Sequence, residues 1–493
     1  MESNDLKNRF ARHLLMFCCA VAALLPATPV ALLAQDDGYR VTSVSIFNYG
    51  DGRYVFQDEK SEKPISGKHR IIDGYKSEYV LAEFDKGMYN GSFRFFKYNN
   101  LIEEGTYREG WRDGKWKKFY ADGKVEEEYT CVQGKVDGVM KTYFQDGKIK
   151  SENNYKNGEP VGKQVEYKED GSIRKEELFV DGKPEGRHVA YITGSRGNYT
   201  ETKNYKNGLP SGEFSKILEN GDVLEKGSYL NGKKDGVWET FKYDGAPETY
   251  VTYKDDMKNG ETRKFFTNGA ISESINYKDD KKDGASKEFY FPSGNLKREV
   301  TFKNGVQDGK EARYEENGKI TMQANYLNGK RDGKQMNLSR DYIETTNYAN
   351  GMQNGETTKT LEDGTVIEKG NYLSGRKEGL WEYFSYTGKP QKTVNYKNDE
   401  QDGETKEFHD NGKVSKIENY KDGRKDGIFT EYYDSGNLRA EYRCSNGRMD
   451  GLRKDYKSDG KRLESEQMFK SGNRIYVKMY NDDGSIKYQD GVE

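Results

Sequence analysis

Short runs of alternating apolar and polar residues fill most of the chain, and glycine-containing steps interrupt them at regular intervals. One such glycine returns 17 times between Gly67 and Gly451, with a mean spacing of 24 residues. A fixed period of this size is typical of a repeat array, in which each repeat buries its apolar side chains only against its neighbours. These periodic glycines are Gly67, Gly91, Gly114, Gly138, Gly162, Gly186, Gly212, Gly236, Gly260, Gly284, Gly309, Gly333, Gly355, Gly379, Gly403, Gly427 and Gly451.

Each 24-residue repeat contains two strand-like runs joined by two glycine-bearing connections. The short connection is an Asx-Gly step such as Asp122-Gly123, for which we expect a type I′ turn with positive φ at both central residues. The longer connection resembles residues 155–158 (YKNG) followed by Gly162. No window carries a sustained 3.6-residue apolar stripe. The pattern predicts an all-β fold, an elongated antiparallel β-hairpin repeat array of about 17 repeats of 24 residues.

Aromatic residues recur at two places in the repeat, and we expect each place to form a ladder along the array. The first aromatic place lies three residues before the glycine of the longer connection, and the second lies five residues after the periodic glycine. The first place holds Tyr107, Tyr155, Phe179, Tyr205, Tyr229, Tyr253, Tyr277, Phe302, Tyr326, Tyr348, Tyr372, Tyr396 and Tyr420. The second place holds Phe96, Phe119, Tyr143, Tyr167, Tyr191, Phe241, Phe265, Phe289, Tyr314, Phe384, Phe408, Tyr432 and Tyr456.

The two ends of the chain depart from the repeat. Basic residues precede an uncharged run over residues 14–34, so residues 1–34 are predicted to be a signal peptide. An uncleaved membrane anchor is the alternative. Residues 35–66 are predicted to form an N-terminal β cap with a hairpin around residues 50–52, because a repeat array must cover its open end. Residues 67–472 then form the repeat array, and residues 473–493 a degenerate closing repeat.

The composition indicates an ordered chain without an electrostatic preference for nucleic acid. Charged residues make up 33% of the chain, yet aromatic residues, in which disordered chains are poor, make up 13% and recur at fixed places. Lys and Arg number 81 against 83 Asp and Glu, with a formal net charge of −2. This balance argues against a nucleic-acid partner; a membrane surface stays open as a partner, although the charge does not support it.

No catalytic, cofactor or metal site is predicted from the sequence. His69 and His188 stand two residues after a periodic glycine, where other repeats carry tryptophan, and His409 stands in a third, distant repeat. We interpret the first two as aromatic substitutes, because three histidines so far apart in an array cannot share one metal. Asp-rich turns such as residues 279–284 lack the ligand spacing of a calcium loop, so the aspartates are assigned to turn formation.

Two cysteines of the array, Cys131 and Cys444, both occupy the first aromatic place. We expect them to be structural and too far apart to pair. Tyr129 and Tyr442, two residues earlier on the same strand face, are expected to fill the volume that the missing aromatic ring leaves.

The Y-K-N-G-K-x-D-G core, the aromatic residues that follow it and the D/N-G-K turn resemble the MORN-repeat variant of bacterial proteins. The resemblance covers about residues 67–484. It implies an extended β array that serves as a binding scaffold without activity of its own. Bacterial chains of this kind are commonly labelled antitoxin components of toxin–antitoxin systems.

We therefore expect a non-enzymatic, exported scaffold that binds a protein partner or an envelope surface. The expected location is periplasmic, outer-membrane associated or extracellular. Two alternatives remain open: a cell-wall or glycan binder that stacks sugars on its aromatic rows, and an antitoxin-like neutralising partner. Full burial of the aromatic rows would remove the glycan platform.

Overall fold

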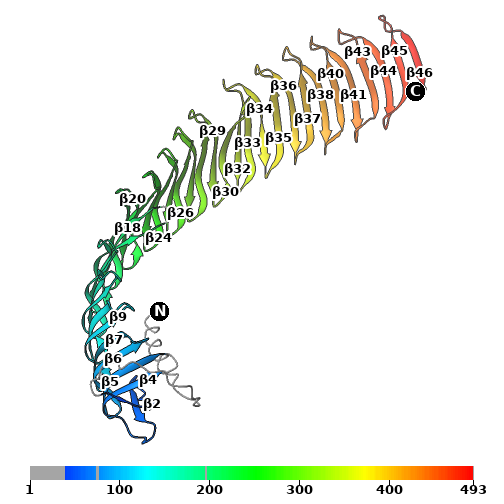
Figure 1. Ribbon diagram of the computed structural model, residues 1–493. Helices are drawn as coiled ribbons and strands as arrows, with labels where there is room; N and C mark the ends of the chain where they lie inside the picture. The colour runs from blue at the N-terminus through cyan, green and yellow to red at the C-terminus, as the bar shows by residue number, and fades with distance from the viewer. Residues whose placement is uncertain (1–38, 74–76, 195–196, 492–493) are drawn as a thin grey trace. The chain divides into compact units, whose positions relative to one another are not determined.

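The computed structural model describes residues 39–73, 77–194 and 197–491, and within these ranges every regular element is a β-strand (Figure 1). The predicted all-β fold is confirmed. The chain divides into two compact parts, an N-terminal part (Met1–Gly245) and a C-terminal part (Ala246–Glu493). The predicted signal peptide lies outside the described residues.

The N-terminal part is built from hairpins that follow one another in chain order. Strands β4 to β22 pair antiparallel in chain order; each two-residue strand (β8, β11, β16 and β21) and the strand after it pair with the same preceding strand. Strand β1 pairs parallel with β4, and β2–β3 form a separate hairpin. Its strands are β1(Arg40–Val41), β2(Val44–Asn48), β3(Tyr54–Asp58), β4(Gly67–Asp73), β5(Glu78–Asp85), β6(Met88–Lys97), β7(Asn100–Arg108), β8(Trp111–Arg112), β9(Gly114–Phe119), β10(Val125–Val132), β11(Lys135–Val136), β12(Gly138–Tyr143), β13(Ile149–Lys156), β14(Glu159–Tyr167), β15(Ile173–Val180), β16(Lys183–Pro184), β17(Gly186–Ile192), β18(Tyr199–Lys206), β19(Leu209–Leu218), β20(Val223–Leu230), β21(Lys233–Lys234) and β22(Gly236–Phe241).

The C-terminal part repeats the same arrangement, with antiparallel pairing from β23 to β46. Its strands are β23(Pro247–Lys254), β24(Met257–Phe265), β25(Ile271–Lys278), β26(Lys281–Phe289), β27(Leu296–Lys303), β28(Val306–Tyr314), β29(Ile320–Leu327), β30(Lys330–Arg331), β31(Gly333–Leu338), β32(Ile343–Ala349), β33(Met352–Thr360), β34(Val366–Leu373), β35(Arg376–Phe384), β36(Pro390–Lys397), β37(Glu400–Phe408), β38(Val414–Lys421), β39(Arg424–Lys425), β40(Gly427–Tyr432), β41(Leu438–Ser445), β42(Arg448–Met449), β43(Gly451–Tyr456), β44(Leu463–Lys470), β45(Asn473–Tyr480) and β46(Ile486–Gly491).

The two connections of the repeat use turn types other than those predicted. At the longer connection, Asn157 and Gly158 both have positive φ (51° and 83°) and Lys156 pairs with Glu159, so the type I′ turn is here. At the short connection only Gly123 has positive φ, and its N–H bonds to Tyr120 O as in a type I turn closed by a glycine bulge. The type I′ prediction for the short connection was wrong. There the Asx side chain instead accepts a backbone N–H, as Asp122 does from Lys124 (3.1 Å).

The periodic glycine marks a bulge just beyond the type I′ turn. Between Asn153 and Tyr155 the register slips, so that Asn153 faces Gln164 while Tyr155 faces Pro160. The Asn154 amide then donates to Lys163 O at 2.6 Å across the bulge. Equivalent asparagines bridge the bulge in six further repeats, at Asn204, Asn276, Asn325, Asn347, Asn395 and Asn419.

Successive repeats are also bonded turn to turn. The Gly329 N–H donates to Gln307 O (2.8 Å), one repeat earlier, and the Asn328 N–H donates to the carboxylate of Asp308 (3.3 Å). Asp308 directly precedes a periodic glycine. The acidic residue of the recurrent Asp-Gly step therefore holds the next turn in place.

The most deeply buried side chains form one row that crosses the strands, with one residue from each strand in turn. On the second strand of each hairpin this residue stands two positions after the periodic glycine. Examples are Trp116, Trp238, Trp381, Thr405 and Phe429, all at most 3% exposed. We call this row the core row. Its members range from glycine to tryptophan and include the fully enclosed carboxylate of Glu311.

The ladder prediction implied that the two aromatic places form the core. In the structure they flank the core row instead. First-place residues lie on the same face as the core row: Tyr229 contacts Trp238 with ring centroids 5.0 Å apart. The second-place residue Tyr143 lies on the other face, where its hydroxyl donates to Glu128 (2.6 Å). Most residues at both places are only half-buried.

The hairpin β2–β3 packs its apolar side chains against the start of the array. Phe56 is 1% exposed and meets Phe84 and Tyr89 with centroids 5.1 and 4.9 Å away. The Phe56 N–H donates to Gly87 O (2.7 Å), which ties the hairpin to the turn between β5 and β6. The predicted hairpin around residues 50–52 is thereby confirmed.

Candidate binding surface

His188 occupies a tryptophan position of the core row, and its ring contacts the carbonyl that tryptophan contacts in other repeats. The indole N–H of Trp238 donates to the carbonyl of Ser228, ten residues earlier, at 3.0 Å. His188 Nε2 lies 2.9 Å from Leu178 O, again ten residues earlier, and its ring packs against Tyr205. The Gln164 side chain donates in the same way to Asn154 O (2.8 Å). His188 thus substitutes for tryptophan, as the sequence predicted.

The other two described histidines also bond to their own surroundings. His69 Nδ1 lies 2.7 Å from the Thr42 hydroxyl, and its ring meets Phe84 edge-on. His409 Nε2 lies 3.0 Å from Tyr432 O, while Nδ1 lies 2.7 Å from Asp434. In other repeats a tyrosine hydroxyl takes the place of this His409 contact, so His409 ties two repeats together.

Cys131 and Cys444 are free and buried. Burial raises the pKa of the Cys131 thiol to about 11, which keeps it protonated and poorly nucleophilic at neutral pH. The ring of Tyr442 stacks on Phe429 with centroids 5.2 Å apart, beside Cys444. This agrees with the expectation that a neighbouring tyrosine fills the space left at the first aromatic place.

The Asp-rich turns use their carboxylates for local hydrogen bonds. Asp280 accepts from the Lys258 N–H (2.8 Å) and Asp279 from the Asn259 amide (3.0 Å). Asp483 accepts from the backbone and the hydroxyl of Ser485. Within the described residues, no three His, Cys, Asp or Glu side chains group as a metal site.

Basic side chains cover the tryptophans of the core row. The Lys234 ammonium lies 3.8 Å from the centre of the Trp238 ring and the Lys377 ammonium 4.0 Å from that of Trp381. Arg112 covers Trp116 at 4.0 Å. Each cation stands four residues before its tryptophan and shields an indole that a single-layer sheet would otherwise expose.

Three glutamates lie in or beside the core row with basic partners. Glu311 bonds to Arg298 and Arg313, 2.9 and 3.0 Å away. Burial raises the pKa of Glu103, although Arg112 lies 2.7 Å away. The Glu418 carboxylate is enclosed by Lys416, Lys425 and Tyr420. Burial alone would raise the pKa of Glu418, but hydrogen bonds from these neighbours outweigh it and lower that pKa to about 2.

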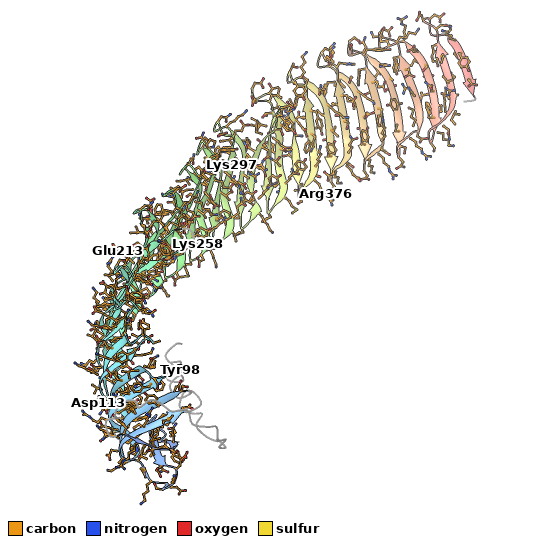
Figure 2. The ribbon with its side chains drawn as sticks, viewed as in Figure 1. Tyr98, Asp113, Glu213, Lys258, Lys297 and Arg376 are labelled. Carbon is orange, nitrogen blue, oxygen red and sulfur yellow. The ribbon has the colours of Figure 1, made fainter. Side chains whose placement is uncertain are left out.

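Exposed aliphatic residues lie beside the type I′ turns of four successive repeats in the C-terminal part. Val306, Leu327, Met352 and Leu373 are 45–56% exposed, and each lies at the stem of one turn. Across three of these stems stands a basic residue: Lys303 pairs with Val306, Lys330 with Leu327 and Arg376 with Leu373. Arg376 marks this edge in Figure 2. We call these four aliphatic and three basic residues the turn-edge row. The sequence signal for it is a large apolar residue directly before or after the N-G or S-G step, opposite a basic residue in three of the four repeats.

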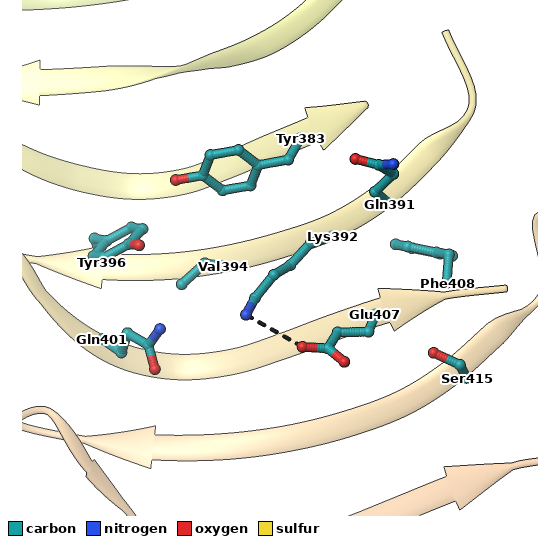
Figure 3. A pocket seen from close by; sticks show the side chains of 9 residues that line it. All are labelled: Tyr383, Gln391, Lys392, Val394, Tyr396, Gln401, Glu407, Phe408 and Ser415. Carbon is teal, nitrogen blue, oxygen red and sulfur yellow. Dashed lines mark ion pairs between the residues drawn. The ribbon is translucent and has the colours of Figure 1, made fainter. Parts of the chain in front are cut away.

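The core-row face of the C-terminal part carries a shallow hollow of about 470 Å³ (Figure 3). Its lining comes from strands β35 to β38. Lining residues are Tyr383, Gln391, Lys392, Val394, Tyr396, Gln401, Glu407, Phe408 and Ser415. Tyr383 stands four residues after its periodic glycine, where most other repeats carry a charged residue, threonine or asparagine. A smaller hollow of about 240 Å³ lies over β6, β7 and β9.

No helix long and apolar enough to cross a membrane is found in the described part of the chain. No curated protein sequence matches the chain.

Solved structures with detectable similarity include the pore of the Photorhabdus luminescens Tc holotoxin, at 11% identity and a TM-score of 0.13, over 87% of this chain and 28% of that one. The TcdB2–TccC3 crystal structure follows at 10% identity and 0.12, over 89% and 30%. The chain thus spans less than a third of either protein, and neither likeness informs fold or function.

The profile of the MORN repeat variant matches eight segments, in both parts of the chain. They are residues 112–130, 136–157, 258–279, 286–304, 307–328, 377–398, 401–422 and 425–443. Seven of these segments contain a periodic glycine, and the eighth, residues 286–304, begins two residues after Gly284. The chain belongs to the family of MORN-repeat proteins.

Proposed function

We propose that the chain is a non-enzymatic repeat scaffold that binds a protein partner or an envelope surface through several repeats at once. The turn-edge row carries this proposal. It places an exposed aliphatic residue in each of four successive repeats, and such a continuous set of apolar groups favours an interaction surface over scattered exposure.

The spacing of the row favours an extended partner. Two strands separate equivalent residues of neighbouring repeats, which is about 9.4–9.8 Å at ordinary strand spacing. The basic residues opposite Val306, Leu327 and Leu373 favour a partner that carries acidic groups beside apolar ones. A second copy of the same row would bring like charges together.

The family and the repeat-array fold support a scaffold without catalysis, because the histidines and buried acids described above are all engaged with structural partners. Export to the periplasm, the outer membrane or the medium rests on residues 1–34 and remains a proposal. The antitoxin-like role is retained as an alternative that the family label suggests.

The experiment replaces the apolar groups of the row and measures capture of proteins from the cell-envelope fraction by quantitative mass spectrometry. The variant is Leu327→Gln, Met352→Gln and Leu373→Gln. The matched control is Leu380→Gln with Ile428→Gln, which changes residues of similar exposure away from the turn edge. We expect the row variant to lose most of its specific capture while the control retains it. Equal capture by both variants would contradict the proposal.

A further inference from the structure

The hollow on the C-terminal part arises where the core row changes from large to small side chains. Trp381 and Phe429 fill the row at either side, and Val394, Thr405 and Glu418 stand between them. Val394 and Thr405 carry no ring, and their neighbours cover both of them, at 1% exposure each. Val394 lines the hollow. The missing ring volume therefore leaves a depression in an otherwise filled row.

Two tyrosines and several uncharged polar groups surround this floor. Tyr383 and Tyr396 stand along one side in Figure 3, with Gln401 beside Tyr396. Gln391 and Ser415 enter from the bulges of β36 and β38, where the register slips opposite β35 and β37. Side-chain amides and hydroxyls both donate and accept hydrogen bonds.

The charges of the hollow cancel. The Lys392 ammonium lies 3.2 Å from Glu407, and these are the two charged residues of its lining. A charged ligand would have to compete with this pair. The lining thus favours an uncharged ligand with many hydroxyl groups and one apolar face.

A buried polar atom beside the hollow lacks a partner. The Thr405 hydroxyl makes no hydrogen bond in the described structure. Thr405 pairs across the strands with Val394, which lines the hollow, and Glu407 lies two residues further on the same strand face. An unsatisfied buried hydroxyl calls for an explanation, and a missing ligand contact is one.

We propose that this hollow is a binding subsite for a short neutral saccharide. Tyrosine rings offer flat apolar faces for the C–H face of a sugar ring, and the amides of Gln391 and Gln401 match paired hydroxyls. The volume lies within the usual range for small-ligand sites of about 300–1,000 Å³. An extended peptide fits less well, because the strand N–H and C=O groups here lie in the plane of the sheet and already bond to neighbouring strands.

The subsite goes beyond the proposed scaffold function, since it lies on the core-row face and shares no residue with the turn-edge row. Either proposal can therefore fail alone.

The test titrates the full chain with tetra-N-acetylchitotetraose, cellotetraose and maltotetraose by calorimetry and saturation-transfer NMR. The first variant, Tyr383→Lys, installs a residue that the array uses at this position, as in Lys359, which pairs with Glu368. The second, Gln401→Ala, removes one amide. Its matched control is Gln353→Ala, the same position two repeats earlier and outside the hollow.

We expect at least one of the three saccharides to bind the native chain and the Gln353→Ala control equally. Tyr383→Lys and Gln401→Ala should each weaken that binding about tenfold or more, with unchanged thermal melting. No binding of any of the three probes to the native chain overturns the proposal. Binding that both hollow variants retain at native affinity also overturns it, because the saccharide then sits elsewhere.

Discussion

Gly370 lies directly beneath the indole of Trp381, and a methyl group on its α-carbon would stand 2.3 Å from that ring. The same relationship joins Gly227 to Trp238 and Gly105 to Trp116. Each tryptophan of the core row is thus accommodated by a glycine on the preceding strand. Large and small neighbours along the row compensate one another.

This relationship predicts that Gly370→Ala destabilises the surrounding strands by about 1–3 kcal/mol, the usual cost of overpacking a filled core. Adding Trp381→Thr, a residue found at this row position in Thr357 and Thr405, should relieve the clash. Amide hydrogen exchange of β34 and β35 measures both effects locally, which suits an array that need not unfold as one unit. Unchanged exchange in Gly370→Ala would contradict the packing described here.

His188 gives a second prediction, because its Nε2 lies 2.9 Å from the Leu178 carbonyl oxygen. His188→Gln keeps a donor, as Gln164 does in the neighbouring repeat, and should be nearly neutral. His188→Leu removes one of the two contacts of this carbonyl, the other being the Glu185 N–H at 2.9 Å, and should lower the free energy of unfolding by about 0.5–1.5 kcal/mol. Urea denaturation compares the two variants. A larger loss for Gln than for Leu would show that the ring does something other than donate this bond.

The two Asx-Gly connections should respond differently to glycine. Asn328 holds a left-handed backbone (φ 50°), so Asn328→Gly should change the unfolding free energy by no more than about 0.5 kcal/mol. Asn317 instead uses its side chain to accept the Lys319 N–H at 2.8 Å. Asn317→Gly should therefore cost about 1–2 kcal/mol through the lost bond and the freer unfolded chain. Equal effects in thermal denaturation would contradict the turn assignment.

Glu418 predicts a pH dependence of stability. Its pKa in the folded chain is about 2, below the ordinary 4.5, so the folded chain binds this proton less tightly than the unfolded chain does. The stability that the carboxylate contributes is fully present above about pH 5 and is lost as the pH falls toward 2. Glu418→Gln should flatten the melting temperature over this interval, while Glu356→Gln, at an exposed glutamate, should leave the native slope. The same slope in both variants would refute the role of Glu418.

The repeat and its strands could be predicted from the sequence because the glycine period is regular. The turn types could not, because both connections contain an Asx-Gly step. Only the strand register shows the number of residues in each turn. At the longer connection Lys156 pairs with Glu159 and two residues lie between them, whereas at the short connection Tyr120 bonds to Lys124 and three residues lie between them. The core row could not be predicted from the sequence for another reason. Its members include Gly370, Trp381 and Glu311, so no shared residue type marks it.

The two proposed binding surfaces could not be predicted from the composition either. An aliphatic residue such as Leu327 beside an Asn-Gly step has the same type as a core residue, and only its exposure shows that it belongs to an outer edge. The hollow depends on Thr405 standing next to Val394 on the neighbouring strand, a juxtaposition that register alone defines.

The central claim is that binding is distributed over repeats, and removing whole repeats tests it most directly. Deleting residues 355–378, 333–378 or 309–378 joins Asn354, Asp332 or Asp308 to Gly379, which preserves the acid- or amide-glycine step and removes one, two or three of the four aliphatic residues of the turn-edge row. Deleting residues 427–450 is the control of one repeat outside the row. For each deletion we measure the affinity for the protein that the native chain captures. The same measurement is made on His188→Ala and His409→Ala.

We expect the affinity to fall stepwise with each repeat removed from the row and to remain near native in the control deletion. Both histidine variants should bind normally wherever they remain folded. Abolished binding in one histidine variant with an unchanged melting curve would contradict the scaffold account, as would an affinity that does not change when all three repeats are removed.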